Sequence, residues 1–276
     1  MCEEVKAKYE KLLEVIKPYG RAVIAFSGGV DSTLLAYASA EALGRENIVC
    51  VTARALSFPA RELEEAEAFC AEQDIRHEII DFDELNVGGF AANPPDRCYL
   101  CKHALFSLFI GVAERERIGF VFDGSNADDP DDFRPGMRAV MELGVKSPLN
   151  EAGLVKKDIR EILKTLGLHV WDKQPFACLA SRIPYGEEIT AEKLNMVEKA
   201  EQFLFIRGFE NLRVRIHGDG CYVARIEVLP EELVRFSGEA LRSETEMYFK
   251  SLGFTWVSLD LTGYRTGSMN EALSLE

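Results

Sequence analysis

The sequence lacks the features that mark membrane, exported and repeat proteins. No apolar run approaches the ~18 residues of a membrane-spanning helix, and the charged N-terminal stretch, residues 1–20, has no apolar signal core. Internal repeats and low-complexity segments are also absent. We therefore expect a cytoplasmic protein with no membrane segment. Its 276 residues suffice for one large domain or two smaller ones.

Positive charge is in short supply. The chain has 32 Lys and Arg residues against 46 Asp and Glu, which gives a formal net charge of −14. A chain this acidic repels a phosphate backbone, so we do not expect nucleic acid as the main partner. A local basic pocket remains compatible with this balance.

The seven cysteines are odd in number and unevenly spaced, which argues against a disulfide framework. Cys98 and Cys101 form a single CxxC pair. Its possible functions are a metal site, an iron–sulfur cluster, a redox pair or none. Without a second CxxC, a third ligand must come from elsewhere, and His103 and Cys178 are the candidates. The remaining thiols of the folded region are interpreted as packed in the core: Cys50, Cys70 and Cys221.

The first part of the chain alternates β-rich runs with helical stretches. Strands are predicted at 21–26, 47–53, 76–82 and 119–124, and helices at 32–43, 60–73 and 101–117. This alternation predicts an α/β fold, a doubly wound parallel sheet with helices on both faces.

The pattern changes after residue 130. A proline-rich stretch, 130–150, is predicted to be loop, and helices follow at 154–168 and 190–209, the second with Thr190 as N-cap. Two alternating runs within 212–228 predict a hairpin, a helix starts at Pro230, and 254–261 predicts a last strand. We therefore expect two domains, 1–170 and a smaller α+β domain at 171–276.

The motif SGGVDS lies between a predicted strand and a predicted helix. Gly28 and Gly29 let the backbone approach an anion closely, and Ser27 and Ser32 can donate hydroxyl hydrogen bonds. Asp31 can cap the helix or help to hold Mg²⁺. An ordinary glycine-rich turn is the alternative, and the loop lacks the Gly-Lys-Ser/Thr ending of a Walker A motif.

This loop resembles the PP-loop of the N-type ATP pyrophosphatases. That family cleaves ATP between the α- and β-phosphates, adenylates a carboxylate or carbonyl oxygen, and lets a nucleophile displace AMP. The resemblance implies ATP and Mg²⁺ as cofactors and places Thr52 and Ala53 beside the adenine. The segment DGSNADD, which follows the fourth predicted strand, would supply Asp128 or Asp129 to Mg²⁺, although an acidic turn is the alternative.

Further motifs resemble one family over nearly the whole chain. They are CLASRIPYG followed by IT, RPGMRA, SPLNEAGLVKKDIR, RVRIH and the closing GYRTGSMN. This combination resembles LarE, the ATP-dependent sulfur transferases (sulfur insertases) of nickel-pincer cofactor synthesis. The resemblance implies that a carboxylate of pyridinium-3,5-biscarboxylic acid mononucleotide is adenylated and that sulfur then gives the thiocarboxylate. It also leads us to expect a homo-oligomer, and it names no sulfide donor.

Two versions of this family differ in their source of sulfur. In one, the cysteine at the position of Cys178 gives up its own sulfur and becomes dehydroalanine. In the other, three cysteines bind a [4Fe–4S] cluster whose unliganded iron carries a sulfide. Because Cys98 and Cys101 accompany Cys178, the chain resembles the cluster version. Sacrifice of Cys178 and a zinc site remain the alternatives.

The resemblance also assigns roles around the substrate. Ser181 and Arg182 match the active-site pair beside the cysteine, and Glu201 matches a nearby acidic residue, although Glu198 lies one turn away. Two alternating arginines would bind the substrate phosphate, unless they are solvated on an exposed strand face: Arg213 and Arg215.

Three other functions remain open. A tRNA thiolase shares the PP-loop and often three cysteines, but it should show a basic face. An amide-forming synthetase would leave the CxxC pair and Cys178 unexplained. A nucleotide sensor would bind ATP without hydrolysing it to AMP and pyrophosphate.

Overall fold

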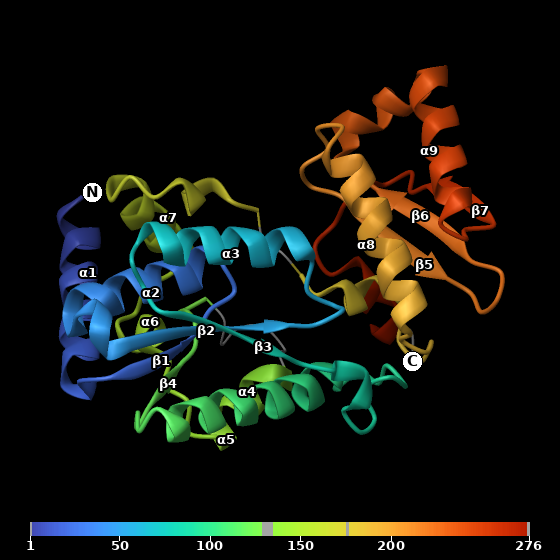
Figure 1. Cartoon of the computed structure of the whole chain (residues 1–276). Helices are drawn as coiled ribbons and strands as arrows, with labels where there is room; N and C mark the ends of the chain where they lie inside the picture. Colours follow the sequence, from blue (N-terminus) through green and yellow to red (C-terminus); the bar gives the residue numbers. More distant parts are fainter. Residues whose placement is uncertain (1, 129–134, 175–176, 275–276) are drawn as a thin grey trace. The chain divides into compact units, whose positions relative to one another are not determined.

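The computed structural model describes residues 2–128, 135–174 and 177–274. The chain divides into two compact units (Figure 1): unit 1 comprises Met1–Asp83 and Asp96–Phe176, and unit 2 comprises Glu84–Pro95 and Ala177–Glu276. Relative to the predicted boundary at residue 170, residues 171–176 group with unit 1 and 84–95 with unit 2. Within the described ranges, no helix combines the length and the hydropathy that a membrane crossing requires.

Unit 1 is built on a sheet of four parallel strands, which confirms the predicted α/β class. The strand order is β3-β2-β1-β4, with Ile24 opposite Cys50 and Thr52 opposite Ile79. The strands are β1 (Ala22–Ala25), β2 (Ile48–Arg54), β3 (His77–Asp81) and β4 (Val121–Phe122). Because both faces are covered, β1 and most of β2 are near-continuous runs of buried residues rather than alternating ones.

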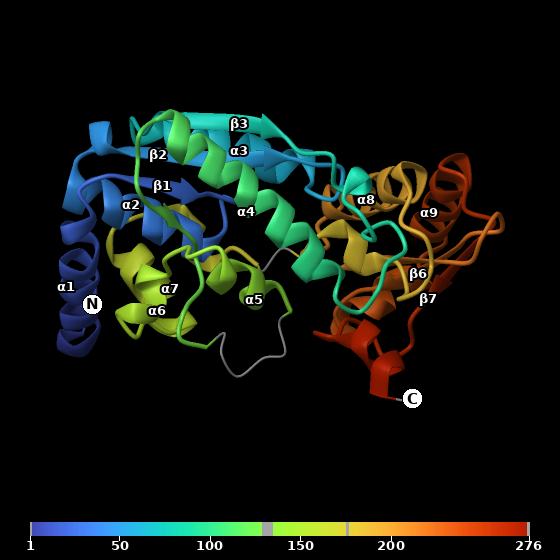
Figure 2. The same cartoon turned by 90° about the horizontal axis from the view of Figure 1, so that it is seen from below.

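Helices cover both faces of this sheet (Figure 1 and Figure 2), as expected for a doubly wound fold. Ile24 packs against one set of helices and Val23 against the other, because neighbouring strand residues point to opposite faces. The first set is α1 (Glu3–Ile16), α2 (Val30–Leu43), α3 (Ala60–Glu72), α6 (Pro148–Glu151) and α7 (Lys156–Thr165). The second set is α4 (Arg97–Arg115) and α5 (Pro135–Glu142).

The prediction of loop throughout 130–150 is wrong for two segments, because α5 and α6 form there. Pro135 and Pro148 are the first residues of these helices, where a proline needs no N–H partner and its fixed φ suits the helix. Gly136 permits close packing of α5 on α4, since a Cβ there would lie 2.6 Å from Lys102 Cδ.

Unit 2 combines a three-stranded sheet with two α-helices. The predicted hairpin is confirmed: β5 (Arg213–His217) and β6 (Val223–Glu227) are antiparallel, and β7 (Trp256–Leu259) pairs in parallel with β6. The helices are α8 (Ala191–Phe205) and α9 (Glu239–Ser251). Thr190 is the N-cap of α8, as predicted, and its hydroxyl accepts the N–H of Lys193 at 3.2 Å. Short 3₁₀ segments complete the two units: Lys17–Tyr19, Arg45–Asn47, Glu84–Asn86, His169–Asp172, Leu179–Arg182, Pro230–Ser237 and Ser268–Ser274.

The segment 84–95 joins unit 2 through backbone and side-chain hydrogen bonds. Asn93 Nδ2 donates to the carbonyls of Ile183 and Pro184, at 3.2 and 2.6 Å, and its own carbonyl accepts the N–H of Gly186 at 3.0 Å. These bonds span about ninety residues of sequence, so no local pattern announces them.

None of the seven cysteines forms a disulfide. Cys50 and Cys70 are buried, as predicted. Cys221 is exposed, so its assignment to the core is wrong. It lies in the loop between β5 and β6, where hairpin patterning says little about burial.

The loop after β1 requires a glycine at one position. Gly28 has a φ of +65°, and a Cβ there would lie 3.3 Å from the Cβ of Ala66. We expect Gly28→Ala to lower the free energy of unfolding by about 1–2 kcal/mol. Gly111→Ala, in the exposed interior of α4, should instead raise it by about 0.5–1 kcal/mol. Urea denaturation of the two variants measures this contrast, and equal shifts would contradict it.

Candidate active site

The loop Ser27–Ser32 turns the chain from β1 into α2. Ser32 Oγ donates to the Gly29 carbonyl at 3.2 Å, lies 3.1 Å from Ser27 Oγ, and accepts the Ser27 N–H at 3.3 Å. The loop is therefore folded around the Ser32 hydroxyl. The N–H groups of the first turn of α2, which starts at Val30, have no acceptor within the helix. This arrangement suits a phosphate group.

A second loop ends at the same edge of the sheet. The strand order reverses between β1 and β4, and ligands of such folds bind at this switch point, beyond the carboxyl ends of the strands. Asp123, the first residue after β4, is buried and accepts the hydroxyls of Ser125 and Ser147, both at 2.5 Å. These bonds brace the loop that leads to Asn126 and Asp128.

The carboxylate of Asp31 lies between these two loops. Lys156, the first residue of α7, places its Nζ 2.5 Å from Asp31 Oδ2. Asn126 Nδ2 is 3.4 Å from Asp31 Oδ1, and Asp128 accepts the backbone N–H of Lys156 at 2.7 Å. The structure thus brings Asp31 and Asp128, both predicted near the nucleotide, to one set of partners. Asp129 lies outside the described residues.

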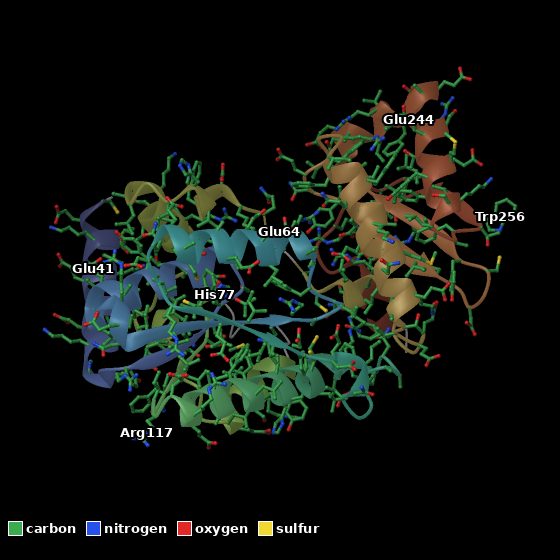
Figure 3. The ribbon with its side chains drawn as sticks, viewed as in Figure 1. Glu41, Glu64, His77, Arg117, Glu244 and Trp256 are labelled. Carbon is green, nitrogen blue, oxygen red and sulfur yellow. The ribbon has the colours of Figure 1, made fainter. Side chains whose placement is uncertain are left out.

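Thr52 lies in the middle of β2 and is almost fully buried. Its hydroxyl donates to the Phe26 carbonyl at 2.7 Å, and His77 Nε2 lies 2.8 Å away. Since the single hydroxyl proton is used on Phe26, His77 must donate through Nε2. Burial lowers the pKa of this histidine, which Figure 3 labels near β2 and β3. Thr52 therefore supports the end of β1, and its contact with adenine stays a prediction.

Lys173 holds the phosphate loop from its other side. Its Nζ donates to the carbonyl of Gly28 at 3.1 Å and forms ion pairs with Glu62 at 2.8 Å and Glu65 at 2.6 Å. The segment at 171–174 is thereby attached to the loop and to α3. Sequence reasoning missed Lys173, because a lysine between Asp172 and a glutamine has no motif around it.

In unit 2, Arg182 and Glu201 form a buried bidentate ion pair. Arg182 is fully buried, and its Nε and Nη2 donate to the two Glu201 oxygens at 2.8 and 2.9 Å. Glu201 also accepts the N–H of Val214 at 3.0 Å. Burial by itself would raise the pKa of Glu201, but the Arg182 charge and these hydrogen bonds outweigh it and hold that pKa below its ordinary value.

Arg182 also holds the segment that carries Cys178. Its Nη1 donates to the Ala177 carbonyl at 2.7 Å, to Ser181 Oγ at 2.8 Å and to the Cys178 carbonyl at 3.3 Å. The predicted residues Ser181, Arg182 and Glu201 are thus brought together. Glu201, rather than Glu198, is the glutamate that pairs with Arg182.

A second buried carboxylate lies on the polar face of the β5–β6 pair. Glu227 accepts Arg215 Nη2 at 2.8 Å and Arg225 Nη1 at 2.8 Å, and Arg215 Nη1 donates to the Ser181 carbonyl at 3.1 Å. Arg215 is buried, so the alternative of two solvated arginines is wrong for it. Burial, and then the Arg182 charge, lower the pKa of Arg213, which shares this face.

The closing GYRTGSMN segment covers part of this face, although the sequence suggested no role for it. Ser268 Oγ lies 3.1 Å from both Arg215 Nη2 and a Glu227 oxygen. The Tyr264 ring lies 5.0 Å from the Arg213 guanidinium carbon, within reach of a cation–π contact. The segment therefore helps to hold both arginines in place.

Comparison with known proteins identifies the family. Residues 5–91, which run from α1 past β3, match the family model described as NAD synthase. An uncharacterized protein of Synechocystis sp. is 41% identical over 98% of this chain and 99% of its own length. The pyridinium-3,5-bisthiocarboxylic acid mononucleotide synthase of Lactiplantibacillus plantarum is 35% identical over 97% of this chain and 95% of its own. The chain belongs to this synthase family, LarE.

The family-level resemblance seen in the motifs is thereby confirmed. This LarE-family chain is an enzyme of the PP-loop ATP pyrophosphatases, a group that uses ATP and Mg²⁺. A polypeptide of the glutamine-hydrolyzing GMP synthase of Thermoplasma acidophilum is 26% identical over 68% of this chain and 64% of its own length. The identity with the Lactiplantibacillus plantarum protein, in contrast, runs through both units.

The three cysteines of the LarE-like motif set are divided between the units. Cys98 is exposed and Cys101 half-buried near the start of α4, one turn apart on the same side of the helix. Cys178 is exposed and directly precedes the 3₁₀ segment Leu179–Arg182 of unit 2. Among the described residues, no group of three or more His, Cys, Asp or Glu side chains is placed to hold a metal ion. The cluster therefore stays a prediction, based on donor chemistry alone.

The buried pair of unit 2 should dominate its stability. We expect Glu201→Gln to lower the free energy of unfolding by about 3 kcal/mol, because it leaves the Arg182 charge buried without a carboxylate. Glu198→Gln, on the same helix and half-buried, should cost about 1 kcal/mol or less. Denaturant unfolding measures both, and a larger loss for Glu198→Gln would contradict this assignment.

The same pair predicts a dependence on pH. Because the pKa of Glu201 is lower in the folded state, its contribution is complete above the ordinary value of 4.5 and is lost as the pH falls below it. The unfolding free energy of the unmodified protein should therefore decrease more steeply between pH 4.5 and pH 3 than that of Glu201→Gln. Parallel curves would show that Glu201 does not titrate in this way.

Proposed function

We propose that this chain activates a carboxylate of pyridinium-3,5-biscarboxylic acid mononucleotide with ATP and Mg²⁺ and replaces the activated oxygen by sulfur. The observation that carries the proposal is the 35% identity with the Lactiplantibacillus plantarum synthase, which extends over 97% of this chain. It includes both the phosphate loop of unit 1 and the arginine–glutamate network of unit 2. The name of that protein states the bisthiocarboxylic acid product.

The activation step is assigned to unit 1. The backbone N–H groups after Gly28 bind the phosphates, and Asp31 and Asp128 supply the oxygen ligands that Mg²⁺ prefers. A substrate carboxylate oxygen attacks the α-phosphorus, and pyrophosphate leaves. The product is an acyl-adenylate, which a sulfur nucleophile can attack.

The substrate is assigned to unit 2. It carries a phosphate and two carboxylates, so it needs cations. Arg213 and Arg215 are proposed to hold the phosphate, with Glu201 and Glu227 keeping the guanidinium groups in place. Arg215 Nε supports this role, because it is a buried donor with no hydrogen-bond acceptor among the described residues. Ser181 Oγ, fixed by Arg182, lies beside the cysteine segment.

For the sulfur source we propose a [4Fe–4S] cluster held by Cys98, Cys101 and Cys178. The donor set fits, since all three are cysteines whose side chains retain access to solvent. Bound there, the group would supply sulfur through the iron that three thiolates leave without a protein ligand. The second candidate is sacrifice of Cys178 itself, which its exposed position favours.

The activity is tested with protein purified without oxygen. Incubation with ATP, Mg²⁺ and the biscarboxylic acid mononucleotide should yield AMP, pyrophosphate and a product in which sulfur replaces a carboxylate oxygen, all measured by mass spectrometry. Transfer RNA in place of the mononucleotide should give no thiolated product. Thiolation of the RNA alone would instead assign the chain to the tRNA thiolases.

The sulfur source is tested with Cys101→Ala. This variant should lose iron and multiple-turnover sulfur transfer while still releasing pyrophosphate, because Cys101 takes no part in activation. Cys221→Ala, at an exposed cysteine of the hairpin loop, is the control and should change none of these. Full sulfur transfer by Cys101→Ala, with a protein lighter by the mass of hydrogen sulfide, would show instead that Cys178 is consumed.

A further inference from the structure

Four residues of unit 1 form a closed ring of hydrogen bonds at the switch point of the sheet. Lys156 Nζ donates to Asp31 Oδ2 at 2.5 Å, and Asn126 Nδ2 lies 3.4 Å from Asp31 Oδ1. Asn126 Oδ1 accepts the N–H of Asp128 at 2.9 Å, and Asp128 Oδ2 accepts the backbone N–H of Lys156 at 2.7 Å. The ring joins the phosphate loop, the segment after β4 and the first residue of α7.

The charges of the ring are those of a cation site. It contains two carboxylates and one ammonium group, which lies against Asp31 where a divalent cation bound by this carboxylate would lie. The side chains of Lys156 and Asp31 are 33% and 23% exposed, so a ligand can reach both. An ion pair with this much exposure contributes little to stability, and a lysine can exchange it for another anion.

We propose that Lys156 binds the β- and γ-phosphates of ATP and that Mg²⁺ takes its place at Asp31. This inference rests on the proposed function. When the substrate carboxylate attacks, an O–P bond forms at the α-phosphorus and the bond to the bridging oxygen breaks. The electron pair of that bond leaves with pyrophosphate. The ammonium of Lys156 stabilises this added negative charge and keeps its proton.

The proposal predicts a change in ligand selectivity. Lys156→Met should weaken the binding of pyrophosphate, and of ATP, by about 10- to 100-fold, measured by calorimetry with Mg²⁺ present. The binding of AMP, which has only the α-phosphate, should change less than about twofold. Lys156→Arg should retain most of the pyrophosphate affinity, because it keeps the charge.

Lys157→Met is the matched control. Lys157 is the next residue of α7 and is exposed, so its removal should leave all three affinities unchanged. Equal losses for AMP and pyrophosphate in Lys156→Met would overturn the proposal, because they would show that the lysine only supports the ring. Unchanged pyrophosphate binding would also overturn it.

Two further measurements keep these outcomes distinct. If circular dichroism shows that Lys156→Met is unfolded, Lys156→Gln replaces it and is judged by the same ratio of affinities. If the unmodified protein binds pyrophosphate but releases none from ATP with the dicarboxylate, the proposed function fails. The affinity ratio still decides the role of Lys156 in that case.

Discussion

The parallel pairing of β1 with β2 on one side and β4 on the other determines where unit 1 can act. Parallel strands end at one edge of a sheet, so the segments that follow β1 and β4 emerge side by side. The contact between Asn126 and Asp31 joins them directly. A nest of backbone N–H groups and a pair of carboxylates thereby come together, as a magnesium–triphosphate ligand requires.

Unit 2 depends on carboxylates buried among arginines. Four guanidinium groups would repel one another if they were brought this close without compensation: Arg182, Arg213, Arg215 and Arg225. Glu201 and Glu227 make the arrangement possible, because each accepts two or more donors in an almost fully buried position. A chain with a net charge of −14 can in this way contain a cationic site for a phosphorylated substrate.

The extents of similarity agree with a division of labour between the units. The match to the model described as NAD synthase ends at residue 91, and that to the Lactiplantibacillus plantarum synthase covers nearly the whole chain. Carboxylate activation is therefore the more widely shared chemistry, located in the phosphate loop. The residues that would distinguish a sulfur acceptor from an amide acceptor belong to the part that fewer relatives share.

Local patterns were sufficient for most elements of the fold. The strand–turn–helix of 21–43, the hairpin and the Thr190 cap each depend on residues close in sequence, and each forms as predicted. The family, too, could be inferred from motifs. The helices α5 and α6 were missed because a proline that starts a helix has the same local signature as a proline in a loop.

By itself the sequence determined the identity of the phosphate loop, the α/β alternation and the residues around Cys178. Only the tertiary structure decided their partners: Lys156 for Asp31, Lys173 for Gly28, and Ser268 for Arg215. The first two of these contacts join residues more than a hundred positions apart, and the third joins residues more than fifty apart. A pattern of period two or 3.6 reports which face of an element is buried. It cannot report which distant charge the fold brings to that face.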